Sequence, residues 1–98
     1  MPRLSIHVRG VVQGVGFRPF VFRIAHARGV TGWVRNRPDG VEIEIQGHRA
    51  ALDAFLASLE QERPAPSRID GVEVSEIPDL AGEAAFEILA SGTSADTR

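Results

Sequence analysis

The stretch "RLSIHVRGVVQGVGFRPFVFRIAHAR", residues 3–28, changes the spacing of its apolar side chains once, and this change decides the fold. Between residues 3 and 10 apolar and polar residues alternate, which is typical of a half-buried strand. Between residues 19 and 28 apolar residues return at helical spacing, with Pro19 at the first helical position, where its missing N–H costs nothing. Gly29 is a natural helix stop. The sequence therefore predicts a strand, a glycine-rich turn and a helix in immediate succession.

The segments downstream complete a known order of elements. "TGWVRN" and "VEIEIQ" flank the turn "RPDG", whose Pro, Asp and Gly favour a hairpin. Because each predicted helix has one apolar stripe, both helices would cover the same face of a sheet. The order β-α-β-β-α-β predicts an α+β, ferredoxin-like sandwich with an antiparallel sheet, two helices on one face and a short extra C-terminal strand. Besides the first strand and helix, the predicted elements are strands at residues 31–36, 41–46, 69–77 and 86–89 and a helix at residues 48–62.

The length and composition of the chain fit one globular domain. Of the 98 residues, we assign 1–90 to this domain, and we predict that residues 91–98 are a polar tail or a linker to domains further downstream. The chain contains no cysteine, which excludes disulfides and thiolate metal sites and favours a reducing compartment. The N-terminus does not have the apolar region of a signal peptide, and no run is long enough to span a membrane. We therefore expect a cytoplasmic protein.

The charges are distributed unevenly along the chain. Residues 1–38 contain seven arginines and no Asp or Glu, whereas residues 39–98 contain four arginines and thirteen acidic residues. The chain has no lysine. Arginine binds phosphate and carboxylate groups through planar, bidentate contacts, although exclusive use of arginine also follows from genomic bias alone. The clustering of positive charge predicts an anionic ligand near the N-terminal part of the chain.

The turn "VQGVGFRP" combines flexible residues with a fixed positive charge. Glycines allow positive φ and can direct successive N–H groups at one point, and the turn ends at a helix N-terminus with Arg18 immediately before it. Together these groups suit a tetrahedral oxyanion such as phosphate. The turn is not a P-loop, which needs a lysine, nor a dinucleotide fingerprint, which needs a glycine where Pro19 stands. The alternative is a glycine-rich turn with a purely structural role.

A second polar residue lies at the end of the second predicted strand. The amide of Asn36 can hold a water molecule by accepting one hydrogen bond and donating another. Arg18 as the phosphate-binding group and Asn36 as the water-holding group would together suffice for the hydrolysis of a phosphoryl group or an acyl phosphate. The alternative is that Asn36 serves the turn "NRPDG", a common position for asparagine.

The motifs "VQGVGFR" and "GWVRN", followed by "DG", resemble the signature of the acylphosphatase family. The resemblance extends from Leu4 to about Leu89 and includes the predicted order of elements. It implies a ferredoxin-like enzyme that hydrolyses carboxyl–phosphate anhydrides without a metal ion. It also implies that Arg18 is catalytic and that the catalytic Asn36 orients water. The implied phosphate-binding residues are Gln13, Gly14, Val15, Gly16, Phe17 and Arg18.

Three stretches point to one branch of that family. "GFRPFVFRIA" and "PAPSRIDGVEV" resemble the N-terminal domain of the hydrogenase maturation carbamoyltransferase, whereas stand-alone acylphosphatases usually lack a proline after the motif arginine, where Pro19 stands here. "DGVEIEIQG" is one residue shorter than the usual stand-alone pattern. His48 departs from the acidic helix cap that relatives often carry. The resemblance implies that the domain binds carbamoyl phosphate and hydrolyses its carboxyl–phosphate bond. This step would feed carbamoyl transfer for the cyanide ligands of nickel–iron hydrogenase.

The same resemblance implies the cofactors and partners. This domain would need no cofactor, whereas the full-length carbamoyltransferase uses ATP and zinc. The implied partner is a maturation protein with a C-terminal cysteine, and neither a membrane nor a nucleic acid is expected. The alternative within the family is a stand-alone acylphosphatase that hydrolyses small acyl phosphates.

Other candidate residues have simpler interpretations. We expect surface or structural roles, rather than metal binding, for His7, His26 and His48, because no ligand spacing recurs. Glu42 and Glu44 are interpreted as a solvated face. A different class of function is a non-catalytic module that binds a phosphorylated ligand or RNA, but these two glutamates on a central strand would repel RNA phosphates. The aromatic residues predicted to lie in the core are Phe17, Phe20, Phe22, Trp33, Phe55 and Phe86.

Overall fold

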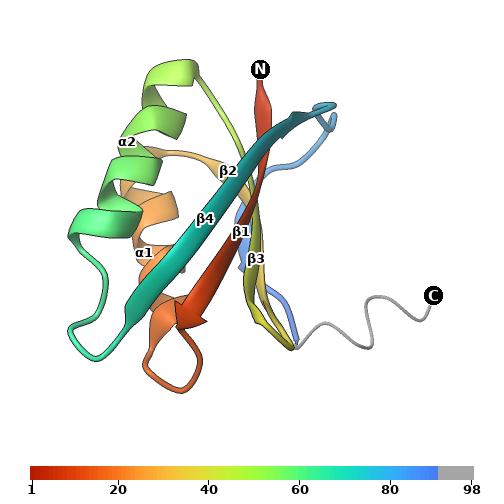
Figure 1. Ribbon diagram of the computed structural model, residues 1–98. Helices are drawn as coiled ribbons and strands as arrows, with labels where there is room; N and C mark the ends of the chain where they lie inside the picture. Colours follow the sequence, from red (N-terminus) through yellow and green to blue (C-terminus); the bar gives the residue numbers. More distant parts are fainter. Residues whose placement is uncertain (91–98) are drawn as a thin grey trace.

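The structure is a computed structural model that describes residues 1–90. It consists of a five-stranded sheet with two helices on one face (Figure 1). This arrangement confirms the predicted ferredoxin-like fold. The predicted polar tail, residues 91–98, lies outside the described residues. None of the helices within residues 1–90 combines the length and apolar character that crossing a membrane would require. The elements are β1 (Arg3–Val11), α1 (Phe17–Arg28), β2 (Thr31–Arg37), β3 (Gly40–Gln46), α2 (Arg49–Gln61), β4 (Arg68–Ile77) and β5 (Phe86–Ile88).

The strands lie in the order β4-β1-β3-β2-β5. β1 pairs antiparallel with both β3 and β4, and β2 pairs antiparallel with β3. The short strand β5 pairs with β2 in the parallel direction, so the sheet is mixed at this edge rather than wholly antiparallel. As a consequence, β2 and β5 both end at the end of the sheet that carries the β1–α1 loop (Figure 1).

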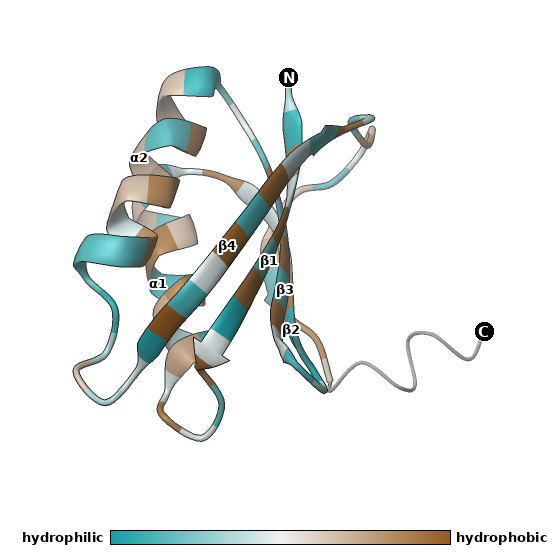
Figure 2. Ribbon diagram, viewed as in Figure 1, coloured by the Kyte–Doolittle hydropathy of each residue, from teal (hydrophilic) through white to brown (hydrophobic). Residues whose placement is uncertain are grey.

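The core follows from the alternation seen in the sequence. Ile6 and Ile43 are opposite each other on β1 and β3 and have no exposed surface, and the apolar side of α2 packs over this face through residues such as Phe55. Figure 2 shows the alternation of apolar and polar residues along β1 and β4. Of the aromatic residues predicted to be in the core, Phe22 is 40% exposed and Trp33 is half-buried on the opposite face of the sheet. The predicted burial is therefore wrong for Phe22 and only partly right for Trp33.

The first helix begins two residues earlier than predicted. α1 starts at Phe17 because Gly16 adopts a left-handed conformation (φ 79°) and acts as the N-cap. Arg18 is therefore the second residue of the helix rather than the residue before it, and Pro19 is the third rather than the first. The proline is tolerated there because N–H groups of the first helical turn have no partner within the helix.

The sheet face without helices carries ion pairs, so Glu42 and Glu44, which were predicted to lie on a solvated face, are only partly exposed, at 24% and 21%. Arg3 is only 1% exposed, and its guanidinium lies 2.9 Å from Glu44 and 2.8 Å from Glu83. A second pair joins Arg35 to Glu42 at 2.9 Å. Because no helix shields this face, the paired charges cover the sheet in place of an apolar layer.

Replacing Glu83 with glutamine should lower the free energy of unfolding by about 2 kcal/mol at neutral pH, because Glu83 accepts hydrogen bonds from Arg3 and Thr31. Burial alone would raise the pKa of Glu83, but these bonds and the charge of Arg3 outweigh burial and hold the pKa below its ordinary value. The stabilisation is therefore present above the unfolded-state pKa of about 4.3 and is lost as the pH falls through the lower folded-state value.

Urea unfolding of both proteins between pH 7 and pH 2 measures this difference. The difference in the free energy of unfolding between the two proteins should shrink as the carboxyl of Glu83 in the wild type becomes protonated. Glu87→Gln, at an exposed glutamate on β5, is the control and should show little difference at any pH. A Glu83→Gln deficit that stays constant over the whole range would contradict the assigned role.

Candidate functional site

The loop between β1 and α1 owes its shape to two glycines. Gly14 and Gly16 have φ values of 72° and 79°, a left-handed region that suits glycine. No atom outside their chain neighbours lies within 4 Å of where a Cβ would stand at either position, so these glycines are required by backbone conformation rather than by space. The buried side chains of Val12 and Phe17 anchor the loop on either side.

The loop presents N–H groups at the start of α1. The N–H of Phe20 donates to Gly16 O at 3.2 Å, which begins the helical bonding. No acceptor within residues 1–90 takes the backbone N–H groups of Gly14 to Arg18. No side chain caps the helix, and its first turn carries no acidic residue. The helix N-terminus therefore has open donors and a partial positive charge, which together favour an anion.

Gln13 connects this loop to the hairpin of β2 and β3. Its side-chain Nε2 donates to the carbonyl oxygens of Arg37 and Gly40, the latter at 2.8 Å. Both lie at the β2–β3 turn, which shares one end of the sheet with the loop (Figure 1). The side-chain N–H donors of Gln13 are thus used within the protein, so its backbone N–H is the donor that remains for an anion. The sequence motif includes Gln13 but does not indicate its two hydrogen-bond partners, Arg37 and Gly40, which lie 24 and 27 residues further along the chain.

Arg18 is half-buried at the second position of α1. Within residues 1–90 its guanidinium has no ion pair or hydrogen bond, unlike the paired arginines Arg3 and Arg35. A cation that no carboxylate neutralises, placed at a helix N-terminus, adds directly to the positive potential of the loop.

Asn36 lies on the helix-covered side of β2, because it is opposite Val41, which is fully buried. The Oδ1 atom of Asn36 is buried and has no hydrogen-bond partner within residues 1–90. Buried polar atoms without a partner are rare in folded proteins, and each needs an explanation such as a bound water or a ligand. The asparagine of the predicted water site therefore carries an unused acceptor.

The hydrogen bonds of Gln13 bring the two predicted motifs together. Arg37, which accepts one of them, is the residue after Asn36, so the loop lies beside the end of β2 that carries this asparagine. Loop N–H groups, the helix N-terminus and Arg18 can hold a tetrahedral oxyanion, and an amide beside them can hold a water molecule. Of the three histidines, His7 contacts Asp39 at 3.1 Å on the opposite face of the sheet, and residues 1–90 contain no group of three potential metal ligands.

The fold and this site define a ferredoxin-like domain with a candidate oxyanion site at its first strand–helix turn. The chain belongs to the acylphosphatase family, whose family model matches residues 4–88. It is 46% identical over 92 residues to the carbamoyltransferase HypF2 of Cupriavidus necator and 46% identical over 76 residues to an acylphosphatase of Chlorobaculum tepidum. These matches cover 94% and 76% of the chain, but 11% of the first protein and 82% of the second.

Solved structures show the same two relationships. A full-length HypF in a phosphate- and nucleotide-bound form matches 92% of the chain with a TM-score of 0.87 and 37% identity, and the match covers 12% of that protein. The acylphosphatase of Bacillus subtilis matches 91% of the chain with a TM-score of 0.84 and 40% identity, and the match covers 99% of that protein. The chain is thus an acylphosphatase-type enzyme domain, related to the N-terminal domain of HypF carbamoyltransferases and to stand-alone acylphosphatases.

Replacing Gln13 with alanine should loosen the loop from the β2–β3 turn, because two hydrogen bonds are lost. We expect KM for an acyl phosphate to rise about tenfold, since misplaced loop donors weaken phosphate binding. Faster hydrogen exchange of the Phe20 amide, which donates to Gly16 O where the loop joins α1, would show the loosening directly. Gln61→Ala, at an exposed position of α2, is the control. A normal exchange rate in Gln13→Ala would contradict the positioning role.

Proposed function

We propose that this domain hydrolyses the carboxyl–phosphate bond of an acyl phosphate, and that carbamoyl phosphate is its substrate within a hydrogenase maturation carbamoyltransferase. One observation carries the proposal: Arg18, which has no carboxylate partner within residues 1–90, stands at a helix N-terminus without a side-chain cap, at the end of the sheet where Asn36 has an unused buried acceptor. Family membership supports the reaction class.

The proposed reaction requires only this chain, the substrate and water. The loop N–H groups and Arg18 hold the phosphoryl oxygens as negative charge redistributes, which is preorganised electrostatic stabilisation. Asn36 holds the water that attacks phosphorus. A bond forms between the water oxygen and phosphorus, and the bond from phosphorus to the bridging oxygen breaks. The carboxylate leaves, as carbamate when carbamoyl phosphate is the substrate. A phosphoryl oxygen accepts the proton of the water, because no side-chain base is evident near the motifs.

The wider role rests on the carbamoyltransferase relatives. Carbamate released here would feed carbamoyl transfer to the C-terminal cysteine of a partner maturation protein, as a precursor of cyanide ligands. In this proposal the domain needs no cofactor, and ATP and zinc act in other domains of the full-length protein. The 46% identity to HypF2 and the proline after Arg18 support this assignment. Since the chain spans 11% of that relative, the activity of the whole protein belongs to the proposal.

A second candidate is a stand-alone acylphosphatase acting on small acyl phosphates. It is supported by the similarity to the Chlorobaculum tepidum and Bacillus subtilis enzymes, of which the matches cover 82% and 99%. Both candidates share the site and the bond that breaks, and they differ in the preferred acyl group. A non-catalytic phosphate-binding module would bind phosphate without turnover.

Phosphate release from carbamoyl phosphate and acetyl phosphate, measured on the 98-residue chain, tests the proposal. We expect enzyme-dependent release from at least carbamoyl phosphate. Phosphate binding without release from either compound would overturn the hydrolytic assignment in favour of a binding module. Release from acetyl phosphate alone would favour the stand-alone acylphosphatase.

A further inference from the structure

The β2–β3 turn lies between the two carbonyl groups that hold Gln13. Pro38 and Asp39 form this turn. Arg37 precedes it and Gly40 follows it, and the carbonyl oxygens of both accept a hydrogen bond from Gln13 Nε2. A displacement of the turn therefore displaces Gln13 and the loop between β1 and α1. Whatever fixes the turn thus also fixes the direction of the loop N–H groups.

The side chain of His7 fixes this turn from the open face of the sheet. His7 alternates with the buried residues Ile6 and Val8 on β1, so its ring lies on the face without helices. Its Nε2 atom lies 3.1 Å from Asp39 Oδ1, although the two residues are 32 apart in the sequence. Side chains therefore attach the turn at two points, to β1 through His7 and to the loop through Gln13.

Charged groups from β1 and from each neighbouring element face His7. They are Asp39 of the turn, Glu42 of β3, Glu73 of β4, Arg9 of β1 and Arg37 of β2. Each of the two glutamates also contacts an arginine, Glu42 at 3.1 Å and Glu73 at 3.0 Å. His7 Nδ1 is 3.8 Å from Glu73 Oε1, which is further than Asp39 Oδ1 is from Nε2. A charge on His7 therefore acts chiefly on Asp39.

The protonation state of His7 sets the strength of this contact. A neutral imidazole has one N–H group and one acceptor nitrogen, whereas a protonated imidazole has two N–H groups and a positive charge. Charge-assisted hydrogen bonds are about twice as strong as neutral ones. When protonated, His7 donates from Nε2 to Asp39 while Nδ1 faces Glu73. The turn is therefore held more firmly at low pH, and this hold weakens as His7 loses its proton.

We infer that His7 and Asp39 are positioning residues for the loop between β1 and α1, and that the site binds an acyl phosphate more tightly when His7 is protonated. The inference rests on the proposed function, in which the loop N–H groups and Arg18 hold the phosphoryl group. His7 lies on the opposite face of the sheet from Asn36, so it acts through the turn and Gln13. Because the side chains of His7 and Asp39 are 31% and 61% exposed, solvent screens the pair, and we expect an effect of about threefold.

NMR spectra of the chain without a ligand test the coupling itself, over the range from about pH 5.5 to about pH 8.5 in which histidine side chains change charge. We expect the Cα signals of Gly14 and Gly16 to shift with the same midpoint as the ring signals of His7. His7→Gln keeps a polar side chain but stays neutral, so it should abolish this shift. Gln13→Ala should also abolish the shift, while His7 itself still titrates.

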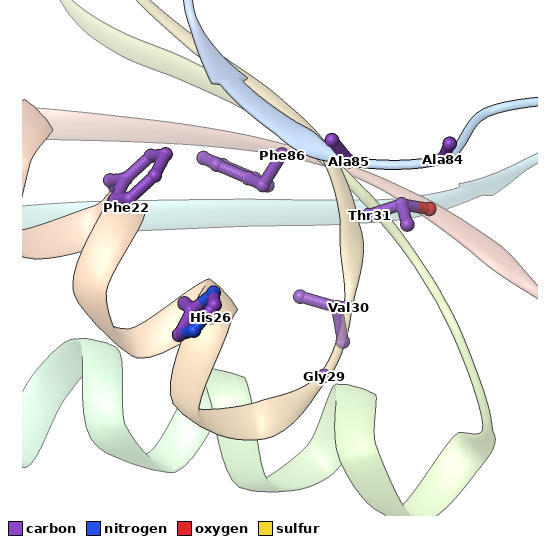
Figure 3. Close-up of a pocket in the computed structure, with 8 residues that line it drawn as sticks. All are labelled: Phe22, His26, Gly29, Val30, Thr31, Ala84, Ala85 and Phe86. Atoms are coloured by element: carbon purple, nitrogen blue, oxygen red, sulfur yellow. The ribbon is translucent and has the colours of Figure 1, made fainter.

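His26→Gln is the matched control for these spectra. Figure 3 shows His26 on α1, beside the pocket that Phe22 and Phe86 line, and it belongs to the last turn of the helix, far from the loop. This variant should leave the shift of the loop signals unchanged. Loop signals that do not follow His7 in the wild type, or that still follow it in Gln13→Ala, would overturn the inferred coupling.

Steady-state kinetics test the consequence for the substrate. The measured quantity is KM of His7→Gln for carbamoyl phosphate divided by KM of the wild type at the same pH, a ratio in which the ionisation of the substrate cancels. We expect this ratio to be about three at pH 5.5 and about one at pH 8.5, with kcat changed less than about 1.5-fold. Asp39→Asn should give the same ratios, and combining it with His7→Gln should add nothing.

The outcomes separate this inference from the proposed function. An equal ratio at both pH values would overturn the role of His7 protonation while leaving hydrolysis intact. A wild-type chain that hydrolyses no acyl phosphate would overturn the proposed function, whereas the ligand-free spectra would still decide whether His7 positions the loop. Dissociation constants for inorganic phosphate would then replace KM in the ratio, with the same expected values.

Discussion

Replacing Arg18 with alanine is expected to abolish measurable phosphate binding and to lower kcat/KM for carbamoyl phosphate by about a thousandfold, which corresponds to about 4 kcal/mol of transition-state stabilisation. The reason is that no carboxylate within residues 1–90 neutralises this guanidinium, so its charge is available to the phosphoryl group. The neighbouring loop donors would remain but would lack the cation that strengthens them. Phosphate release under steady-state conditions and titration with inorganic phosphate measure the two effects.

Arg23→Ala is the matched control for this prediction. Arg23 belongs to the same helix, is exposed, and also has no partner among the described residues. It should keep rates close to those of the wild type, which separates the position of Arg18 from a general loss of positive charge. Arg18→Lys keeps the charge but loses the planar fork, and we expect it to recover only part of the activity. Normal rates in Arg18→Ala would remove the basis of the proposed function.

Replacing Asn36 with alanine is expected to lower kcat about a hundredfold while leaving the affinity for inorganic phosphate within about threefold of the wild type. In the proposed mechanism Asn36 holds the attacking water and makes no essential contact with phosphate. The buried Oδ1 atom has no hydrogen-bond partner among the residues that the structure describes, so its removal breaks no hydrogen bond in this part of the chain. We therefore expect the melting temperature of Asn36→Ala to be unchanged or raised.

The stability measurement distinguishes a functional asparagine from one that serves the β2–β3 turn. A turn role would require hydrogen bonds within the protein, and Asn36→Ala would then lower the melting temperature. A variant with normal turnover but weakened phosphate binding would contradict the water-holding role. Asn36→Asp adds a further check, because a negative charge in this place should weaken phosphate binding as well as turnover.

Much of the fold could be predicted from the sequence, because the signals are local. The alternation in "VEIEIQ" identifies β3 and its buried face, and the burial of Ile43 confirms it. The sequence predicts the start of α1 two residues too late, because proline favours the first helical position, whereas the left-handed Gly16 caps the helix earlier. The parallel pairing of β5 could not be read from three residues, since direction depends on which edge of the sheet the strand reaches.

The open face of the sheet shows a similar limit. Glu44 alternates with apolar residues, which predicts a solvated side chain. In the structure Arg3, from a distant part of the chain, forms ion pairs with both Glu44 and Glu83 and partly covers this face. Phe22 is also more exposed than the sequence predicts, because the short strand β5 leaves one side of this ring uncovered. Both errors concern residues whose environment is formed by strands that are remote in sequence.

For the candidate site, the sequence by itself determined the chemical groups: glycines that permit a left-handed loop, an arginine next to it and an asparagine at a strand end. These groups can be identified from residue types and short sequence spacings, without knowledge of the fold. Only the tertiary structure decided that Gln13 is used to join the loop to the β2–β3 turn, and that Oδ1 of Asn36 remains without a partner within residues 1–90. The physical reason is that hydrogen-bond partners and burial depend on the pairing of strands, which brings together residues that are far apart in the chain.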